Sequence, residues 1–370
     1  MKPRNPFLVA GYRGPEWFCD REAETNRILS ALQNERNLTL VAPRRYGKTG
    51  LVRNVLHLLG DEWTPVYVDI YATSNLREFT EAFAGAIVGA LDSATDKVLS
   101  AVGRFFKSVR PTVTPDGTGG VSFSFSVEPQ AAERTLIDVF DYIASKNRRI
   151  AVAIDEFQQI RAYPESGTEA LLRSRIQFCE NANFIFAGSR HHVLADMFTS
   201  PKAPFYQSAD ILSLDVIPPD RYAAFAKRFF AGDGRPFSES AFDALWRRFD
   251  GITWYVQAVL NRIWGDGGGL DSEADIDMAV DSLVEERGLT FHDLLAGQTA
   301  VGKKLLRAVA SERRVPEITA GAFLRKHGLA APSSVRAAVP ALVERDLLYK
   351  ADSGFVVYDR LFAEWLRSRP

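Results

Sequence analysis

The segment APRRYGKT (42–49) has the residue types and the spacing of a phosphate-binding loop. It fits the pattern GxxxxGK[ST], with alanine in place of the first glycine. In such loops, backbone N–H groups and the amino terminus of the following helix hold an anionic phosphate. Gly47 would let the backbone approach the phosphate, Lys48 would reach its terminal groups, and Thr49 would bind Mg²⁺. The alternative is a chance match in a basic turn, but an apolar strand precedes the segment 42–49 and a helical pattern follows it.

The segment AVAIDE (151–156) is an apolar strand that ends in two carboxylates. We expect Asp155 to hold Mg²⁺ through water, and Glu156 to orient and deprotonate an attacking water. The alternative is an acidic helix start that only complements the helix dipole. A glutamate beside the magnesium aspartate favours a nucleoside triphosphatase over a nucleoside kinase.

The segment FIFAGSRHH (184–192) is another buried strand that ends in polar groups. Ser189 and Arg190 would lie near the terminal phosphate, where a cation can stabilise transferred charge. The alternative is a solvated arginine. The segment RSR (173–175) is similarly either a set of exposed helix arginines or an arginine finger supplied to a second subunit, so oligomerisation stays open.

The elements that must position these residues form an alternation of strands and helices. The expected strands are LTLVA (38–42), PVYVDIY (65–71), RIAVAIDE (149–156) and FIFAGSR (184–190). Buried strands that alternate with helices predict an α/β fold, a three-layer sandwich around a mostly parallel sheet. Ligands bind at the carboxyl ends of such strands, so the three motifs should meet at one edge.

Three domains are expected. Residues 1–218 form the P-loop core, with a hairpin insertion near 109–129 that contains alternating apolar residues after a turn cluster. Helical patterns dominate 219–289 and predict a helical lid. Residues 290–370 predict a winged helix-turn-helix, because short helices, a turn and a longer helix precede a two-strand wing and a closing helix.

The composition limits the classes of protein. The 370 residues carry a net charge of −1 and are 46% hydrophobic, as in ordinary globular proteins. That charge gives no global attraction to nucleic acid or to a membrane. Cys19 and Cys179 form neither a disulfide scaffold nor a zinc motif, which favours a reducing cytoplasm. No apolar stretch approaches the ~20 residues that span a bilayer, so we expect no membrane association.

These motifs together resemble the archaeal-type ATPase family, within the AAA+/STAND group of P-loop NTPases. APRRYGKT is similar to the family's G-P-R-R-x-G-K-T loop, IDEFQQI to its D-E-F-Q strand end, and FAGSR to its sensor-1 strand. FCDREAE, GITWYVQ and YDRLFAEWL are similar to further family segments. The chain departs from the family at Asp20, where glycine is usual, and at Thr253 and Arg360, where proline is usual.

The resemblance implies ATP or ADP with Mg²⁺ as the cofactors, and an ATP-driven switch that hydrolyses slowly, moves its lid and winged helix, and acts on an unknown protein partner. It also implies that Arg21 packs beside the nucleotide. The expected nucleotide-binding residues are Pro43, Arg44, Arg45, Tyr46, Gly47, Lys48, Thr49, Gly50 and Arg21. The expected catalytic residues are Glu156, Lys48, Arg190 and Ser189, and the expected metal ligands are Thr49 and Asp155.

Two other functions stay open. Residues 291–370 carry 13 Lys/Arg against 8 Asp/Glu, an asymmetry that favours DNA binding through the winged helix. The expected recognition helix is SSVRAAVPALVER (333–345), in which Arg336 would face DNA and Pro340 should kink or split the helix. A structural winged helix and a regulator that holds ADP without hydrolysis are the remaining alternatives.

Overall fold

A computed structural model describes residues 5–92, 109–115, 121–329, 331–351 and 353–369. The chain divides into two compact units. The first contains Ala10–Ile217, and the second contains Pro218–Pro370 together with the N-terminal residues that end at Val9. The expected tip of the hairpin insertion, 116–120, lies outside the described residues.

The first unit is built on a five-stranded parallel sheet with the order β2-β5-β6-β1-β7. Its strands are β1 (Leu38–Val41), β2 (Trp63–Asp69), β5 (Arg149–Asp155), β6 (Ala182–Gly188) and β7 (Asp210–Ser213). Every residue of β1 and β6 is buried, as expected for a parallel sheet that is covered on both faces. The predicted α/β fold with a mostly parallel sheet is therefore confirmed.

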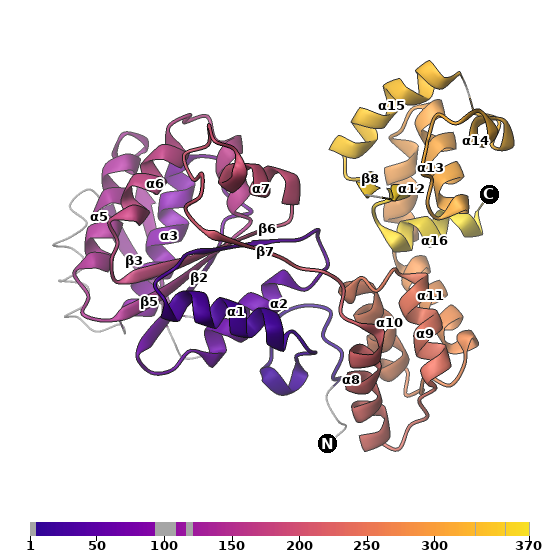
Figure 1. Cartoon of the computed structure of the whole chain (residues 1–370), viewed down its shortest axis with the longest axis horizontal. Helices are drawn as coiled ribbons and strands as arrows, with labels where there is room; N and C mark the ends of the chain where they lie inside the picture. The colour runs from indigo at the N-terminus through magenta and orange to yellow at the C-terminus, as the bar shows by residue number, and fades with distance from the viewer. Residues whose placement is uncertain (1–4, 93–108, 116–120, 330, 352, 370) are drawn as a thin grey trace. The chain divides into compact units, whose positions relative to one another are not determined.

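Helices cover both faces of this sheet (Figure 1). One face carries α1 (Glu22–Gln33) and α2 (Lys48–Leu58), and the other carries α3 (Leu76–Leu91), α5 (Ala132–Ala144), α6 (Thr168–Gln177) and α7 (His191–Thr199). Short 3₁₀ helices lie at η1 (Pro15–Trp17), η2 (Pro129–Ala131) and η3 (Phe157–Ala162). Each face buries its own apolar cluster, which fixes the strand ends that carry the motifs.

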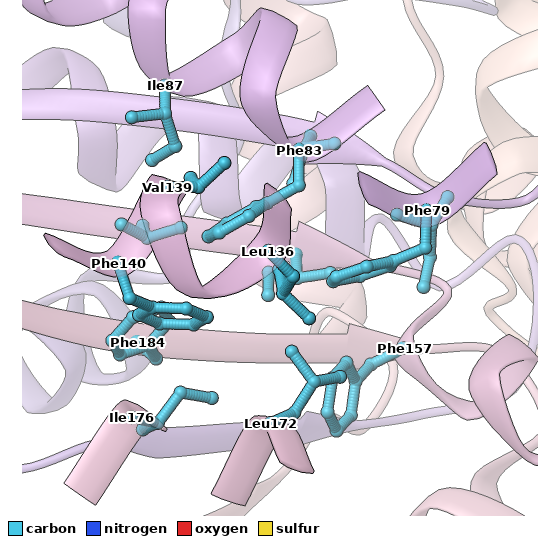
Figure 2. Close-up of a cluster of buried hydrophobic side chains, with 14 of the residues drawn as sticks. Phe79, Phe83, Ile87, Leu136, Val139, Phe140, Phe157, Leu172, Ile176 and Phe184 are labelled. Carbon is cyan, nitrogen blue, oxygen red and sulfur yellow. The ribbon is translucent and has the colours of Figure 1, made fainter. Parts of the chain in front are cut away.

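The larger of the two clusters is aromatic (Figure 2). Phe79 and Phe83 of α3 stack with ring centroids 5.6 Å apart, and Phe83 lies 5.5 Å from Phe140 of α5. Phe157, which follows the second motif, is fully buried and lies 4.5 Å from Phe186 of β6. The residue after Glu156 is thus anchored in the core, which holds the end of β5 in place.

The insertion forms a separate antiparallel pair of strands, β3 (Val109–Pro115) and β4 (Val121–Val127). Phe125 and Val127 near the end of β4 are buried in the core cluster of α3 and α5. The backbone N–H of Val127 also donates to Glu81 Oε1 on α3 at 2.9 Å. The hairpin is therefore attached to the unit by its second strand.

The second unit consists of helices followed by a small antiparallel sheet. Its first four helices are α8 (Pro219–Gly232), α9 (Glu239–Arg248), α10 (Thr253–Gly265) and α11 (Glu273–Glu286). The remaining elements are α12 (Gly288–Ala296), α13 (Ala300–Glu312), α14 (Gly321–Lys326), α15 (Pro332–Glu344), β8 (Leu348–Ala351), β9 (Gly354–Val357) and α16 (Arg360–Ser368). The last group has the element order of a winged helix.

The expected recognition helix differs from the prediction in one respect. Helix α15 continues through Pro340 as one element, so of the two predicted outcomes, a kink or a split, the split does not occur. Proline removes one N–H donor and leaves the carbonyl four residues earlier without its helical partner. Because Pro340 is exposed, water can satisfy that carbonyl.

The N-terminal residues pack into the second unit. Phe7 is fully buried, with ring centroids 5.4 Å from Phe230 of α8 and 5.9 Å from Trp264 of α10. Asn5 Nδ2 donates to the carbonyl of Asn261 at 2.8 Å, and Trp254 Nε1 donates to the carbonyl of Val9 at 3.0 Å. The chain therefore passes between the two units twice, after Val9 and after Ile217.

Candidate nucleotide site

The phosphate-binding segment is a tight loop between β1 and α2. Arg45 and Gly47 both have left-handed backbone conformations, with φ of 73° and 88°. Glycine adopts this conformation without steric cost, which explains Gly47. Ala42 is buried and Gly50 lies beside Phe18, whose ring would be 3.5 Å from a Cβ at that position. Helix α2 begins at Lys48, so the loop ends at the amino terminus of a helix, as a phosphate site requires.

Lys48 lies across this loop and is 5% exposed. Its Nζ donates to the carbonyls of Ala42 and Pro43, at 2.8 Å each. Burial lowers the pKa of Lys48 to about 8, although the charges of Glu156 and Asp155 act in the opposite direction. The ammonium is thus held against the loop by two neutral acceptors, and an anionic phosphate would offer it a stronger, charge-assisted partner.

The two expected metal ligands lie in contact. Thr49 Oγ1 donates to Asp155 Oδ2 at 2.8 Å, and the backbone N–H of Glu156 donates to Asp155 Oδ1 at 3.0 Å. A hydroxyl and a carboxylate are the hard oxygen ligands that suit Mg²⁺. Among the described residues, no group of three or more His, Cys, Asp or Glu side chains could hold a metal ion. Mg²⁺ usually takes one or two protein ligands and completes its shell with phosphate and water.

Glu156 has an unusual backbone and a fixed carboxylate. Its φ is 57°, in the left-handed region, immediately before the short helix η3. Its Oε2 accepts from Ser189 Oγ at 2.7 Å and from Gln158 Nε2 at 2.6 Å. Arg44 Nε in turn donates to Ser189 Oγ at 3.3 Å. The structure therefore brings Glu156, Ser189 and Arg44 together from three separate segments.

Arg21 is also beside the loop, because it is almost fully buried at 4% exposure. Its guanidinium donates to the carbonyls of Tyr46, at 3.4 Å, and Asp215, at 2.5 Å, and pairs with Glu24 at 2.7 Å. Arg21 thus connects the loop with the segment after β7. That Arg21 packs beside a bound nucleotide stays a prediction.

Arg190 does not join this network. It is exposed at the N-cap of α7, and the structure shows no hydrogen bond or ion pair of its side chain with any described residue. Its neighbour Ser189, in contrast, is buried and bonded to Glu156. Ser189 and Arg190, which the sequence predicted to lie together near the terminal phosphate, therefore have different surroundings.

Three contributors to the site were not predicted from the sequence. Gln158 bonds Glu156 and packs so closely on Gly188 that a Cβ there would lie 1.9 Å from its Oε1. Tyr67 of β2 donates from its hydroxyl to Asp155 Oδ2 at 2.8 Å. Asp69 pairs in register with Asp155, and burial, together with the charges of Asp155 and Glu156, raises its pKa. Gln158 belongs to the D-E-F-Q segment, but nothing in the spacing of the motifs indicated the contact of Tyr67 with Asp155.

A buried lysine over a tight strand-to-helix loop, beside a threonine–aspartate pair on a parallel sheet, defines the class of P-loop NTPases. Residues 18–259 match the family described as an ATPase domain predominantly from Archaea, and the chain belongs to this family. Residues 289–368 match a probable winged helix domain. The chain is therefore a nucleotide-binding P-loop ATPase with a C-terminal winged helix, as the resemblance implied. The structure contains no helix, within the part of the chain that it describes, that is long and apolar enough to cross a membrane.

Solved structures with the same fold match nearly the whole chain. A Walker-type ATPase of Pyrococcus abyssi is 19% identical, with a TM-score of 0.65 over 98% of this chain and 99% of that one. The ORC2 protein of Aeropyrum pernix, solved as ADPNP–ADP complexes, is 16% identical, with a TM-score of 0.60 over 99% and 96%. The ORC1 protein of the same organism, solved with DNA, is 14% identical, with a TM-score of 0.52 over 99% and 97%. At these identities the likeness is one of fold, and no curated protein matches the sequence.

Proposed function

We propose that the chain binds ATP with Mg²⁺ at the loop before α2, hydrolyses it slowly, and uses the nucleotide state as a switch. The observation that carries this proposal is the contact of Thr49 Oγ1 with Asp155 Oδ2 beside the buried Lys48. Lys48 and Thr49 begin the helix after β1, and Asp155 ends β5, which lies two strands away in the sheet. Together they supply the charge and the oxygen ligands that a magnesium–triphosphate needs. A chance basic turn would not place them together.

The roles follow from the contacts. The loop and Lys48 would hold the phosphates, and Thr49 and Asp155 would hold Mg²⁺, which supplies charge stabilisation to the transferred phosphoryl group. Glu156 would orient the attacking water and accept its proton. The bonds of Glu156 with Ser189 and Gln158 fix the carboxylate at the end of β5. Arg190, being exposed, would have to gain its contact from the bound nucleotide or from a second subunit.

The switch part of the proposal rests on Arg21. Its guanidinium joins the carbonyl of Tyr46 in the loop to the carbonyl of Asp215. The second unit begins at Pro218, only a few residues after Asp215. A nucleotide that moves the loop would therefore disturb the segment that leads into the helical lid and the winged helix.

The binding step is tested by equilibrium titration with a fluorescent ATP analogue in the presence of Mg²⁺. We expect micromolar binding by the wild-type protein and loss of binding in Lys48→Ala, because the buried ammonium is the main cation of the loop. Lys202→Ala, which removes an exposed lysine of the same unit, is the matched control and should bind like the wild type. Retained micromolar affinity in Lys48→Ala would overturn the site assignment.

A second candidate function is DNA binding by the winged helix. The pKa of Glu317 lies below its ordinary value, first because Thr319 donates hydrogen bonds to it and then because of the charges of Arg336 and Lys350. Arg336 of α15 and Lys350 of β8 are both exposed, so the helix and the wing place cations near one another. Such an arrangement suits phosphate contacts. Salt-dependent binding to duplex DNA that weakens in Arg336→Ala would support this function, and its absence at low salt would exclude it.

A further inference from the structure

The carboxylate of Asp155 is held by three donors, and one of them belongs to a residue without an assigned role. Tyr67 Oη and Thr49 Oγ1 both donate to the same oxygen, Oδ2, at 2.8 Å each. The other oxygen accepts from the backbone N–H of Glu156 at 3.0 Å. Asp155 is 4% exposed, so these bonds replace water around a buried carboxylate.

The sheet register explains how Tyr67 reaches this carboxylate. Strands β2 and β5 are parallel, and Tyr67 pairs with Ala153, two residues before Asp155. Alternate residues of a strand share a face, so Tyr67 and Asp155 lie on the same face, offset by about 6.6 Å along the strands. A phenol is long enough to span this offset, whereas shorter hydroxyl side chains are not.

The ring of Tyr67 is itself fixed from the helix that carries Thr49. The guanidinium carbon of Arg53 lies 3.5 Å from the centroid of the ring, as in a cation–π contact. Arg53 follows Thr49 by four positions on α2, and residues at this spacing share a helix face. One face of α2 therefore holds Asp155 directly through Thr49 and indirectly through Tyr67.

We propose that Tyr67 is a positioning residue for the metal half of the site. It keeps Oδ2 of Asp155 directed toward Thr49, so that the two oxygen ligands are arranged for Mg²⁺ before the ion arrives. Residues that orient metal ligands in this way typically change metal affinity by about 10- to 100-fold when they are removed. The inference rests on the proposed ATP–Mg²⁺ site, and its test must therefore separate the two.

The test measures how Mg²⁺ strengthens the binding of a fluorescent ATP analogue. Affinity is determined in EDTA and at increasing Mg²⁺ concentrations for the wild type and for Tyr67→Phe, which removes only the hydroxyl. We expect unchanged affinity in EDTA and about tenfold more Mg²⁺ for half-maximal enhancement, because the phosphate contacts remain and only the metal ligand is loosened.

Tyr142→Phe is the matched control. The Tyr142 hydroxyl also donates to an aspartate of the first unit, Asp92, but from α5. Tyr142→Phe removes a tyrosine–aspartate hydrogen bond away from the site, so the Mg²⁺ dependence of its ATP-analogue binding should equal that of the wild type. Tyr67→His keeps a polar ring but is too short to reach Oδ2, so we expect the same loss as in Tyr67→Phe, and it provides a second test if the phenylalanine variant folds poorly.

The variant Asp155→Asn distinguishes a failure of the proposed Mg²⁺ site from a failure of the proposed role of Tyr67. If Asp155→Asn keeps the wild-type enhancement by Mg²⁺, the metal site itself is misplaced and the proposed function is wrong. If Asp155→Asn loses the enhancement while Tyr67→Phe and Tyr67→His both match the wild type, the proposed function stands and the role of Tyr67 is overturned.

Discussion

At the scale of single residues, the site depends on carboxylates that are each held by more than one donor. Asp155 is bonded by Thr49 and Tyr67, and Glu156 by Ser189 and Gln158. Carboxylates that accept from several donors have one defined orientation, which catalytic and metal-binding groups need. The geometry of the site is thus a property of the neighbours as much as of the motif residues.

The variant Gly188→Ala tests how far the carboxylate of Glu156 depends on its neighbour Gln158. A Cβ at this position would lie 1.9 Å from Gln158 Oε1 and 3.2 Å from Leu194, so Gly188→Ala must displace the glutamine that bonds Glu156. Overpacking of this kind typically costs about 1–3 kcal/mol, and we expect a loss of unfolding free energy in that range by urea denaturation. Gly60→Ala, where a Cβ would meet nothing within 4 Å, should change the stability little. Equal stabilities of the two variants would contradict the close packing of Gln158.

The sequence indicated that the three motifs meet at one edge of the sheet, but not all the contacts that their side chains make. Lys48, Thr49 and Asp155 could be identified from the sequence because each stands at a fixed place in a motif. The parallel sheet then requires the motifs to meet at one edge. The contact of Tyr67 with Asp155 depends on which strand lies beside β5 and on one side-chain conformation. Spacing along the chain contains neither fact.

At the scale of elements, the N-terminal residues behave as part of the second unit. The ring of Phe7 meets Phe225 and Phe229 edge-on, with centroids 6.5 and 6.0 Å away, in addition to its contacts with Phe230 and Trp264. Nothing in the sequence predicted this, because the partners of residues 5–9 lie more than 200 positions along the chain. The helices were predictable from their periodicity, and the strands from short apolar runs, because both faces of a parallel sheet are buried.

Phe7→Ala measures the contribution of this segment. Removing a fully buried phenylalanine leaves a cavity among aromatic rings and typically costs about 3–5 kcal/mol. We expect a loss of this size in the unfolding free energy of the second unit, seen as a lower unfolding temperature in calorimetry of the full chain. Val9→Ala changes a neighbouring residue that is 41% exposed and should have little effect. A calorimetric profile unchanged by Phe7→Ala would contradict the packing.

At the scale of the whole molecule, ion pairs join the helical region to the winged helix within the second unit. Arg248 of α9 bonds Glu364 of α16 at 3.1 Å, and Arg360 Nη2 bonds Asp250 Oδ2 at 2.8 Å. The backbone N–H of Arg360 also donates to the hydroxyl of Tyr255 on α10 at 2.9 Å. A proline, the family's usual residue at position 360, has no N–H to donate. The departure from the family pattern therefore adds contacts between these elements.

Glu364 gives this connection a pH dependence. Burial alone would raise its pKa, but the hydrogen bond from Arg248 and the charges of Arg367 and Arg248 outweigh burial and hold the pKa below its ordinary value of 4.5. A carboxylate with a lowered pKa contributes stability that is present above its ordinary pKa and is lost as the pH falls through the folded-state value. We expect Glu364→Gln to cost about 1–3 kcal/mol at pH ~7. The difference from the wild type should narrow below pH ~4 in urea denaturation.

Glu344→Gln changes an exposed glutamate of α15 and serves as the control, with no expected change at either pH. A constant difference between Glu364→Gln and the wild type at both pH values would show that the carboxylate charge is not what joins α9 to α16.

The central claim, that the site hydrolyses ATP and that Glu156 activates the water, is tested most directly by phosphate release from ATP with Mg²⁺. Wild type, Glu156→Gln and Lys48→Ala are compared at saturating nucleotide. We predict slow release by the wild type and a fall of about 10²–10⁴-fold in Glu156→Gln, the usual contribution of a general base, with nucleotide affinity unchanged. Equal release by the wild type and Glu156→Gln, both at the Lys48→Ala background, would instead identify a nucleotide-bound regulator that does not hydrolyse.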